Sequence, residues 1–431
     1  GHDVFYLNEG DGTFKDVTKE LGIENKEMGA SAAFFDSDKD GWLDLYVTNY
    51  VQYSTDENPE CIGRMHTPDH GKTHVRSYCD PDNFFGEADK FFYNNKGIFI
   101  DRSSRSGINR VQYKGLGVVP GDVDNDGDMD IYVANDKEMN LLFINNGKGR
   151  FVEKALAMGV GYNGDGLAEA GMGVDFGDFN RDGWLDIFVT HFTGETNTLY
   201  ENQGLGYFTD ASMETGLGKP SIPFLAFGTK FIDLNLDGWL DIFVANGHVI
   251  DNINLINKKY QHAQHNQVYM NKKNSTFEDK TYDIGGDLTQ KAVSRGSAFG
   301  DIDNDGDIDY IVSNNNQSAS LMYNVGDPSN NWIGIELEGV DCNRDAIGTK
   351  LTLMSKSGTQ IAWINPASSY LTSNDKRIVF GIEKDNKIVS LEISWFGSNT
   401  QTLLNMEPNY YYKIIQNEVP KKIEYKFQQS F

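Results

Sequence analysis

The sequence is poor in cysteine, proline and positive charge. Its 431 residues include 3 Cys and 10 Pro, and 38 Lys and Arg stand against 63 Asp and Glu, which gives a formal net charge of −25. So few cysteines exclude a small disulfide scaffold. The excess of carboxylates leaves no basic stripe to meet phosphates, so nucleic acid is not an expected partner.

Long apolar runs are missing as well. A membrane-spanning helix needs about 18 or more consecutive apolar residues, and no such stretch occurs, so no transmembrane segment is predicted. The opening residues GHDVFYLNEGDG do not resemble a cleavable signal peptide. HExxH, GxSxG and P-loop motifs are also absent. No enzyme class is therefore indicated by a motif.

What the sequence has instead is an acidic nine-residue phrase that occurs five times. Each copy has oxygen-bearing side chains at positions 1, 3, 5 and 9 and Gly at position 6. Hard cations such as Ca²⁺ take six to eight oxygen ligands, and Gly lets a loop turn sharply around the ion. We therefore predict about five Ca²⁺ ions. The predicted ligands are Asp36, Asp38, Asp40, Asp44; Asp122, Asp124, Asp126, Asp130; Asp178, Asn180, Asp182, Asp186; Asp233, Asn235, Asp237, Asp241; and Asp301, Asp303, Asp305, Asp309.

These acidic loops differ from EF-hands beyond position 9. An EF-hand needs a bidentate Glu at position 12, whereas position 12 is Val in all five copies. The residues after each loop are β-branched or aromatic, as in Leu45-Tyr46-Val47, and predict a strand rather than a helix. Each loop is thus expected to be the turn of a β-hairpin. The alternative, that Asp, Asn and Gly only form turns, suits one copy better than five of identical spacing.

A second phrase recurs between the acidic loops. It consists of a strand, an Asn/Gly turn and another strand, as in INNGKGRFVEKA (144–155) and YENQGLGYFTDAS (200–212), which predicts a second hairpin. Two hairpins form a unit of four antiparallel strands, and repetition about every 55 residues predicts a β-propeller of six or seven blades. The chain opens on an outer hairpin (4–18) without an inner one. That hairpin either completes the last blade or belongs to a blade begun by a preceding segment, and we expect the second.

Phrases such as GASAAFFDSDKDGWLDLYVTN resemble the FG-GAP/VCBS-type repeats of integrin-α-like propellers. Further along, NRDAIG (343–348) and SYLTSND (369–375) resemble the ASPIC/UnbV module that follows such propellers. The resemblance implies that the acidic loops bind calcium. We expect an all-β protein with a propeller at 1–329, an ASPIC/UnbV module at 330–417 built as a small β-sandwich, and a tail at 418–431.

An insertion at 50–86 interrupts the first unit. It holds Cys61, His66, His70, His74 and Cys79. These residues could form a Cys/His zinc cluster, or the two cysteines could form a disulfide across the loop. The resembled family tends to carry a Cys pair here without the three histidines, which favours the disulfide.

Polar residues gather where the second strands of the units end, on the face opposite the acidic loops. Propellers usually bind ligands around the central opening. The candidate binding or catalytic residues at this opening are His191, His248, Glu169, Asp136 and Arg295. The alternative is that these side chains cap strand ends and bond to neighbouring loops.

The pattern favours a secreted, periplasmic or cell-surface protein stabilised by calcium. We expect a binding or adhesion role toward an unknown protein or carbohydrate, or a role as a subunit of a larger surface assembly. The alternative is an enzyme, a lyase or oxidoreductase acting on carbohydrate or a secondary metabolite at the central opening. An opening closed by the insertion would favour binding.

Overall fold

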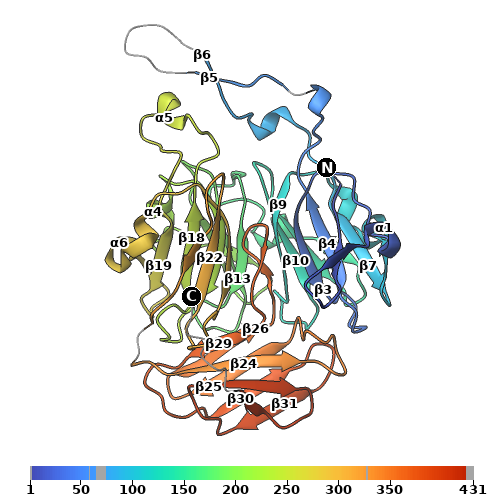
Figure 1. Ribbon diagram of the computed structural model, residues 1–431, viewed down its shortest axis with the longest axis vertical. Coiled ribbons are helices and arrows are strands. Elements are labelled where there is room, and N and C mark those ends of the chain that lie inside the picture. Colours follow the sequence, from blue (N-terminus) through green and yellow to red (C-terminus); the bar gives the residue numbers. More distant parts are fainter. Residues whose placement is uncertain (1, 58, 65–73, 327–328, 424–431) are drawn as a thin grey trace.

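The computed structural model describes all residues except 1, 58, 65–73, 327–328 and 424–431, and it shows an all-β molecule (Figure 1). Antiparallel sheets stand around a central axis in the larger, propeller-like part, and a smaller β-module lies at one end. Within the described ranges, no helix is long and apolar enough to cross a membrane.

Each repeat unit forms one sheet, here called a blade, in which the acidic loop joins the first two strands. A separate hairpin, β1 (Tyr6–Asn8) and β2 (Phe14–Asp16), precedes the first blade. The described residues form five blades and this hairpin, and the number of blades in a closed ring stays a prediction. The blades are β3 (Gly29–Phe35), β4 (Asp44–Asn49), β7 (Lys90–Asn95), β8 (Ile98–Asp101); β9 (Gly115–Gly121), β10 (Asp130–Asn135), β11 (Leu141–Asn145), β12 (Phe151–Glu153); β13 (Val174–Gly177), β14 (Asp186–Val189), β15 (Thr198–Asn202), β16 (Phe208–Asp210); β17 (Ala226–Ile232), β18 (Asp241–Asn246), β19 (Gln267–Asn271), β20 (Phe277–Asp279); and β21 (Ser294–Gly300), β22 (Asp309–Asn314), β23 (Ser320–Met322).

Most of the short helical turns connect the outer strand of one blade, or the N-terminal hairpin, to the next blade, whereas residues 253–256 form a helix between the second and third strands of the fourth blade. After α1, α2 and α3, glycines with φ between 80° and 96° turn the chain away. The helices are α1 (Thr18–Leu21), α2 (Ser103–Ser106), α3 (Ala155–Met158), α4 (Gly218–Ser221), α5 (Ile253–Ile256) and α6 (Thr281–Ile284), with 3-10 turns at Thr55–Glu57, Pro81–Asn83, Ile108–Arg110 and Gly286–Thr289. The insertion adds the hairpin β5 (Ile62–Arg64) and β6 (His74–Arg76).

The C-terminal module contains two four-stranded sheets. Their strand orders are β29 (Ile378–Gly381), β24 (Trp332–Glu338), β32 (Tyr411–Ile415), β33 (Lys421–Ile423) and β26 (Gly358–Trp363), β25 (Lys350–Ser355), β30 (Ser390–Ser394), β31 (Thr400–Leu404). The all-β module expected at 330–417 is therefore present as two sheets. Strand β33 pairs with β32, so the expected tail supplies an edge strand before residue 424.

The C-terminal module packs on the face that carries the acidic loops (Figure 1). One apolar cluster continues from the first two blades into the module, including Phe35, Met129, Ile347 and Trp395. Every acidic loop contacts the module: the contacts are Lys39 over the Phe396 ring, Lys350 Nζ to Asn125 Oδ1 (2.9 Å), Arg181 to Ser357 O (3.2 Å), Glu383 N to Leu236 O (3.1 Å) and Tyr411 Oη to Asp301 Oδ2 (2.6 Å). The C-terminal module does not cover the opposite face of the ring, which is the face on which the insertion lies.

A hairpin of the C-terminal module enters the ring itself. This central hairpin, residues 365–375, contains β27 (Ala367–Ser368) and β28 (Thr372–Ser373), and Figure 1 shows it in orange-red among the blades. It bonds to the first strand of every blade: the bonds are Leu371 N to Ser31 Oγ (3.4 Å), Asn365 Nδ2 to Pro120 O (2.6 Å), Ser369 N to Val174 O (2.8 Å), Thr229 N to Ser369 Oγ (3.1 Å) and Thr372 Oγ1 to Ser297 O (3.1 Å). The module therefore supplies the hub around which the blades are arranged.

Candidate functional site

The acidic loops have the backbone that their glycines predict. Position 6 is glycine with φ between 81° and 100° in all five loops, and position 4 is also left-handed although no glycine stands there. The first, second and fifth loops each bring three carboxylates together, with ligand atoms within 4.8 Å of one another. These sets are Asp36, Asp38, Asp40; Asp122, Asp124, Asp130; and Asp301, Asp303, Asp309.

The chemistry of these three loops fits a hard cation. Among the described residues, Asp38, Asp122 and Asp303 each have a buried Oδ1 without a hydrogen-bond partner. Burial, together with the neighbouring carboxylates of Asp40 and Asp38, raises the pKa of Asp36 to about 6. Desolvated carboxylates that repel one another are stabilised by a divalent ion, so Ca²⁺ suits this donor set.

The third and fourth loops differ at position 3. Asn180 and Asn235 stand there, and each side-chain amide donates to the position-5 Asp at 3.1 Å. An amide oxygen is a neutral calcium ligand, so these loops offer one charge fewer.

The aspartate at position 9 has a second task, which the ligand prediction did not include. Asp186 Oδ1 accepts from Asn202 N (2.8 Å) and its Oδ2 accepts from Phe179 N (3.2 Å). Asp44 forms the same pair of bonds with Asn94 N and Ser37 N. Position 9 thus ties the acidic loop to the third strand of its own blade.

In four of the five blades, an asparagine on or just after the third strand then joins neighbouring blades. Asn202 Nδ2 donates to Val123 O of the preceding blade (2.9 Å) and to Leu185 O of its own blade (3.1 Å). The same inter-blade bond is made by Asn145 to Ser37 O, Asn271 to Phe179 O and Asn324 to Leu234 O. These asparagines recur at the same position of the second repeated phrase, where the sequence pattern predicted only turn residues.

On the open face, a cavity of about 620 Å³ occupies the middle of the ring. Its apolar wall includes Leu116, Met172 and Phe227 from three different blades, and Tyr370 and Leu371 at the tip of the central hairpin also line it. Ser369 and Leu371 have φ of 70° and 52°, a strained conformation for residues other than glycine. This central cavity is therefore built from both parts of the chain.

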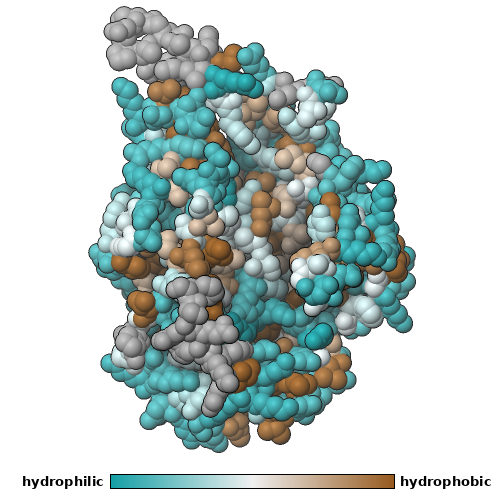
Figure 2. Space-filling model, viewed as in Figure 1, coloured by the Kyte–Doolittle hydropathy of each residue, from teal (hydrophilic) through white to brown (hydrophobic). Residues whose placement is uncertain are grey.

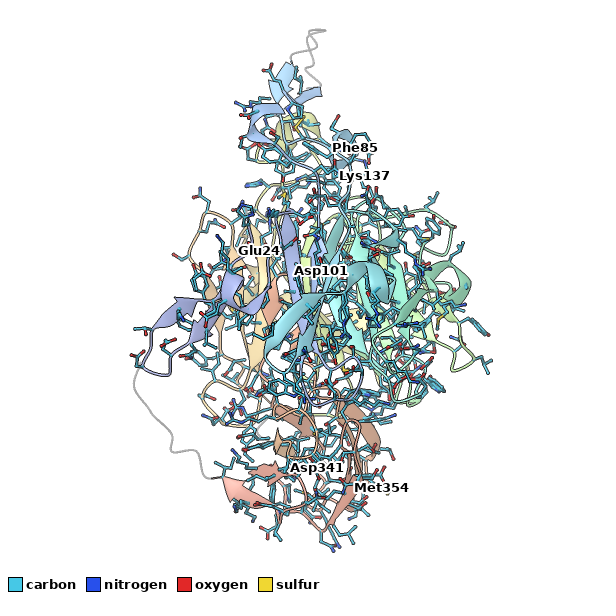
Figure 3. The ribbon with its side chains drawn as sticks, turned by 90° about the vertical axis from the view of Figure 1, so that its right-hand side faces the viewer. Glu24, Phe85, Asp101, Lys137, Asp341 and Met354 are labelled. Atoms are coloured by element: carbon cyan, nitrogen blue, oxygen red, sulfur yellow. A yellow bond between two sulfur atoms is a disulfide. The ribbon has the colours of Figure 1, made fainter. Side chains whose placement is uncertain are left out.

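The insertion lies over the mouth of the central cavity. Tyr78 and Pro81 line the cavity, and Lys137 Nζ holds the segment through Asp80 (2.8 Å) and Asp82 (2.6 Å). Figure 3 places Phe85 and Lys137 at the end of the molecule opposite Asp341 and Met354.

The two cysteines of the insertion, Cys61 and Cys79, form a disulfide, as the resemblance favoured. Bonded sulfurs cannot also be thiolate ligands, which removes the cysteines from the alternative zinc cluster. His66 and His70 of that cluster lie outside the described residues.

Two of the five predicted opening residues, Asp136 and Arg295, line the central cavity. Asp136 accepts a hydrogen bond from Tyr50 Oη (2.6 Å), and burial raises its pKa to about 6. Glu195, which the sequence did not single out, also lines the cavity and accepts from Ala170 N (2.9 Å) through Oε2.

The other three predicted residues, His191, His248 and Glu169, are buried in the ring and do not line the cavity. His191 Nδ1 bonds to Thr196 O (2.8 Å), and Glu169 accepts from Thr198 Oγ1 (2.8 Å). His248 Nδ1 accepts from Ile250 N (3.0 Å), and burial lowers its pKa to about 4. These side chains do what the alternative proposed: they fasten loops at strand ends.

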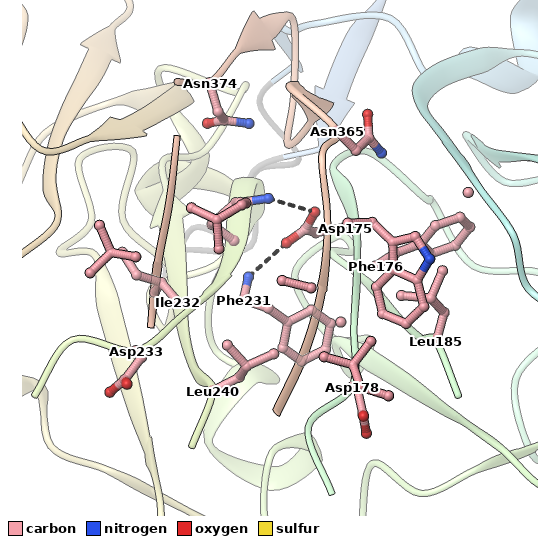
Figure 4. Close-up of a pocket in the computed structure, with 18 of the residues that line it drawn as sticks. Asp175, Phe176, Asp178, Leu185, Phe231, Ile232, Asp233, Leu240, Asn365 and Asn374 are labelled. Carbon is pink, nitrogen blue, oxygen red and sulfur yellow. Dashed lines mark hydrogen bonds and ion pairs between the residues drawn. The ribbon is translucent and has the colours of Figure 1, made fainter. Parts of the chain in front are cut away.

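A smaller cavity of about 180 Å³ lies between the acidic-loop face and the C-terminal module. Figure 4 shows Asp175 at its centre, where it accepts from Lys230 Nζ (3.1 Å) and Phe231 N (2.7 Å). Because Lys230 also bonds to Ser368 of the central hairpin, this polar group belongs to the junction of the two parts.

Comparison with protein families agrees with this architecture. The FG-GAP-like repeat matches residues 1–47, 122–189, 178–244 and 233–312, and the ASPIC and UnbV domain matches 339–421. The chain belongs to the FG-GAP-like repeat family. Within that family it is one of the members that carry an ASPIC and UnbV domain, here the C-terminal module.

This FG-GAP repeat protein is similar to cartilage acidic protein 1. It is 25% identical to the Xenopus tropicalis protein over 393 residues, covering 88% of this chain and 53% of that one, and 26% identical to the human protein over 391 residues, covering 88% and 52%. The chain thus spans about half the length of these relatives.

Among solved structures, an Agrocybe aegerita protein that recognises non-reducing terminal N-acetylglucosamine has a TM-score of 0.30 at 17% identity, covering 71% of this chain and 93% of that one. The V. cholerae biofilm matrix protein Bap1 has a TM-score of 0.32 at 11% identity, covering 94% and 62%. With TM-scores this low, we base nothing on these likenesses.

Proposed function

We propose that this chain is an extracellular binding protein, stabilised by calcium at the acidic loops, whose ligand enters the central cavity. The observation that carries the proposal is the cavity itself: about 620 Å³, apolar walls from several blades, and a few polar groups at its rim. Sites for small ligands are typically concave, mostly apolar and equipped with a few fixed polar groups.

An extracellular location is supported by the Cys61–Cys79 disulfide, because disulfides persist in oxidising compartments. It is also supported by the calcium assignment, since weak calcium loops are filled where calcium is millimolar. A role in adhesion or surface assembly remains part of the same proposal, with the cavity as the place where a protruding group of the partner binds.

A binding role is favoured over an enzyme by the position of the imidazoles. His191 and His248 are fully enclosed and cannot reach a ligand in the cavity, so the enzyme alternative would have to work with Asp136, Glu195 and Arg295. The insertion lies over the opening, the arrangement expected for binding.

The test is a ligand screen with a blocked cavity as its control. The whole chain, labelled and kept in millimolar calcium, is applied to a glycan array and to an extracellular-protein array. Val249→Trp fills the cavity from a half-buried loop position, and Val340→Trp adds the same ring on the exposed surface of the C-terminal module. Ligands captured by wild type and Val340→Trp should be lost by Val249→Trp. Capture that survives in Val249→Trp would place the binding site elsewhere and contradict the proposal.

A further inference from the structure

From the charge and hydrogen-bonding groups of the central cavity we infer its ligand class: the end of an acidic saccharide, a sugar chain whose terminal unit carries a carboxylate. The inference rests on the proposed function and adds the chemistry of the ligand. Arg295 is the residue assigned to the carboxylate.

Arg295 is a fixed cation that lacks a countercharge. Its Nη1 donates to Gly247 O (2.8 Å) and Ser294 O (2.7 Å), its Nη2 donates to His248 O (3.5 Å), and its guanidinium lies 4.3 Å above the Phe227 ring. Among the described residues, no carboxylate forms an ion pair with it, whereas Lys114 and Lys137 nearby on the same face are each paired. Half-buried charges are normally paired, and Arg has five N–H donors suited to a carboxylate. The carboxylate is therefore expected from the ligand.

The rest of the rim suits hydroxyl groups. Asp136 and Glu195 are acceptors held in place by Tyr50 Oη and by the Ala170 N–H, and a sugar hydroxyl can donate to either. Both stand among apolar and aromatic surfaces, including Phe192 and Tyr370, on which a sugar ring can pack. Fixed acceptors, one unpaired cation and ring faces in a single cavity match a polyhydroxylated acid.

The closed floor decides which part of a saccharide can enter. Tyr370 and Leu371 of the central hairpin line the cavity, and the C-terminal module covers the far end of the ring. A polysaccharide therefore cannot thread through the ring. Only a chain end or a short oligosaccharide can reach Arg295.

The experiment measures binding of three probes to the whole chain by calorimetry, at fixed millimolar free calcium because acidic sugars chelate it. The probes are trigalacturonic acid, its fully methyl-esterified form, and triglutamate. We expect the acid to bind at least about tenfold more tightly than its ester, because the charged hydrogen bond to Arg295 is lost in the ester. The preference should shrink as salt rises.

Variants assign the preference to Arg295. Arg295→Gln should bind acid and ester equally, with ester affinity unchanged, and the exposed Arg105→Gln should behave as wild type. Should Arg295→Gln fail to fold, Lys137→Gln, a variant of the other cation that lines the cavity, decides: the preference for the acid should survive in it, and loss of the preference would overturn the assignment to Arg295. Equal wild-type binding of acid and ester, equal weakening of both by Arg295→Gln, or tighter binding of triglutamate would each overturn the inference.

Failure of the inference differs from failure of the proposed function. A neutral sugar whose binding is lost in Val249→Trp would overturn the acidic ligand and keep the cavity as the binding site. Binding of any probe that is indifferent to Val249→Trp would overturn both.

Discussion

At the scale of single residues, the most informative side chain is the asparagine that joins one blade to the next. Its amide reaches a carbonyl in the acidic loop of the preceding blade, while its own N–H is held by the position-9 aspartate. The carboxylate that completes the acidic phrase therefore also orients the inter-blade contact.

Asn202→Ala should destabilise the chain by roughly 1–3 kcal/mol, because it leaves the buried carbonyls of Val123 and Leu185 without their donor. The measurement is the urea unfolding midpoint in saturating calcium. The exposed Asn109→Ala serves as control and should change the midpoint little. Equal midpoints for the two variants would show that the inter-blade bond contributes nothing.

His248 should make stability depend on pH. Its pKa in the folded chain is about 4, below the ordinary 6.5, because burial disfavours the imidazolium. Between these values the unfolded chain binds a proton that the folded chain excludes, so the stability due to neutral His248 is complete above pH 6.5 and is lost as pH falls toward 4.

Unfolding free energies of wild type and His248→Asn at pH 7.5 and pH 5 test this expectation. Wild type should lose on the order of 2 kcal/mol more than the variant between the two pH values. Taking the difference between proteins removes effects of pH on calcium, and His2→Gln, at an exposed position, should match wild type. Parallel pH profiles for wild type and His248→Asn would contradict the assignment.

Sequence pattern predicted residue types at the acidic loops well and at the central cavity poorly. Five identical spacings mark the acidic loops and their candidate ligands because the acidic residues of each loop lie within nine positions of one another, and their role as calcium ligands stays a prediction. Arg295 and Glu195 are far apart in sequence and line the same cavity only because the ring brings their blades together. Their sequence neighbours resemble those of any polar residue at a strand end. His191 and His248 look equally functional in sequence, and only their burial shows that they fasten loops.

At the scale of elements, the central hairpin is the part that sequence could not place. Its motif SYLTSND resembles that of a known family, yet nothing in the local pattern predicts that a turn of one module enters another. Ser369 illustrates the demand on this turn. It is buried, has φ of 70°, and its hydroxyl accepts from Thr229 N and contacts Ser297 Oγ at 3.1 Å.

Substitutions at Ser369 should destabilise in the order Val, then Ala, then Gly. All three remove the hydroxyl, Ala adds the strain of a left-handed residue without a polar side chain, and Val adds a β-branch. We expect roughly 1–2 kcal/mol for Gly and roughly 3–4 kcal/mol for Val by urea unfolding. Ser104→Val on the exposed surface of α2 is the matched control. A Gly variant less stable than the Val variant would contradict the backbone part of the explanation.

The hairpins themselves were predicted correctly, because a strand, a turn and a strand are local in sequence. Val at position 12 of each acidic phrase excluded an EF-hand and predicted a strand after the loop. These strands are β4, β10, β14, β18 and β22. The local pattern did not show which face of the propeller the C-terminal module would cover.

At the scale of the whole molecule, the C-terminal module covers the acidic loops, so the proposed calcium sites lie at the junction of the two parts. Every acidic loop contacts the C-terminal module, and Tyr411 Oη donates directly to the first ligand position of the fifth loop. The outer surface of the molecule is mostly hydrophilic in the view of Figure 2, while an apolar cluster crosses the junction. Loosening of the loops is therefore expected to loosen the module.

Removal of calcium should lower the melting temperature by about 10 °C or more, because each filled site contributes about 2–3 kcal/mol when calcium is a hundredfold above its dissociation constant. Differential scanning calorimetry in calcium and in excess EDTA measures the shift, and elemental analysis counts the ions. Hydrogen exchange of residues 365–375 should rise together with that of the loops. An unchanged melt with no calcium found would refute the metal assignment, and exchange confined to the loops would refute the linkage.

The central hairpin also has a consequence for the order in which the molecule is made. All five blades precede residue 365 in the chain, yet their first strands bond to residues 365–375. During synthesis the ring cannot reach its final structure before the central hairpin has been made. Contacts between residues more than 300 positions apart, such as Ser31 with Leu371, therefore form last. Folding of this protein should therefore be slow and cooperative, and the blades should stay unstable until the C-terminal module has been synthesised.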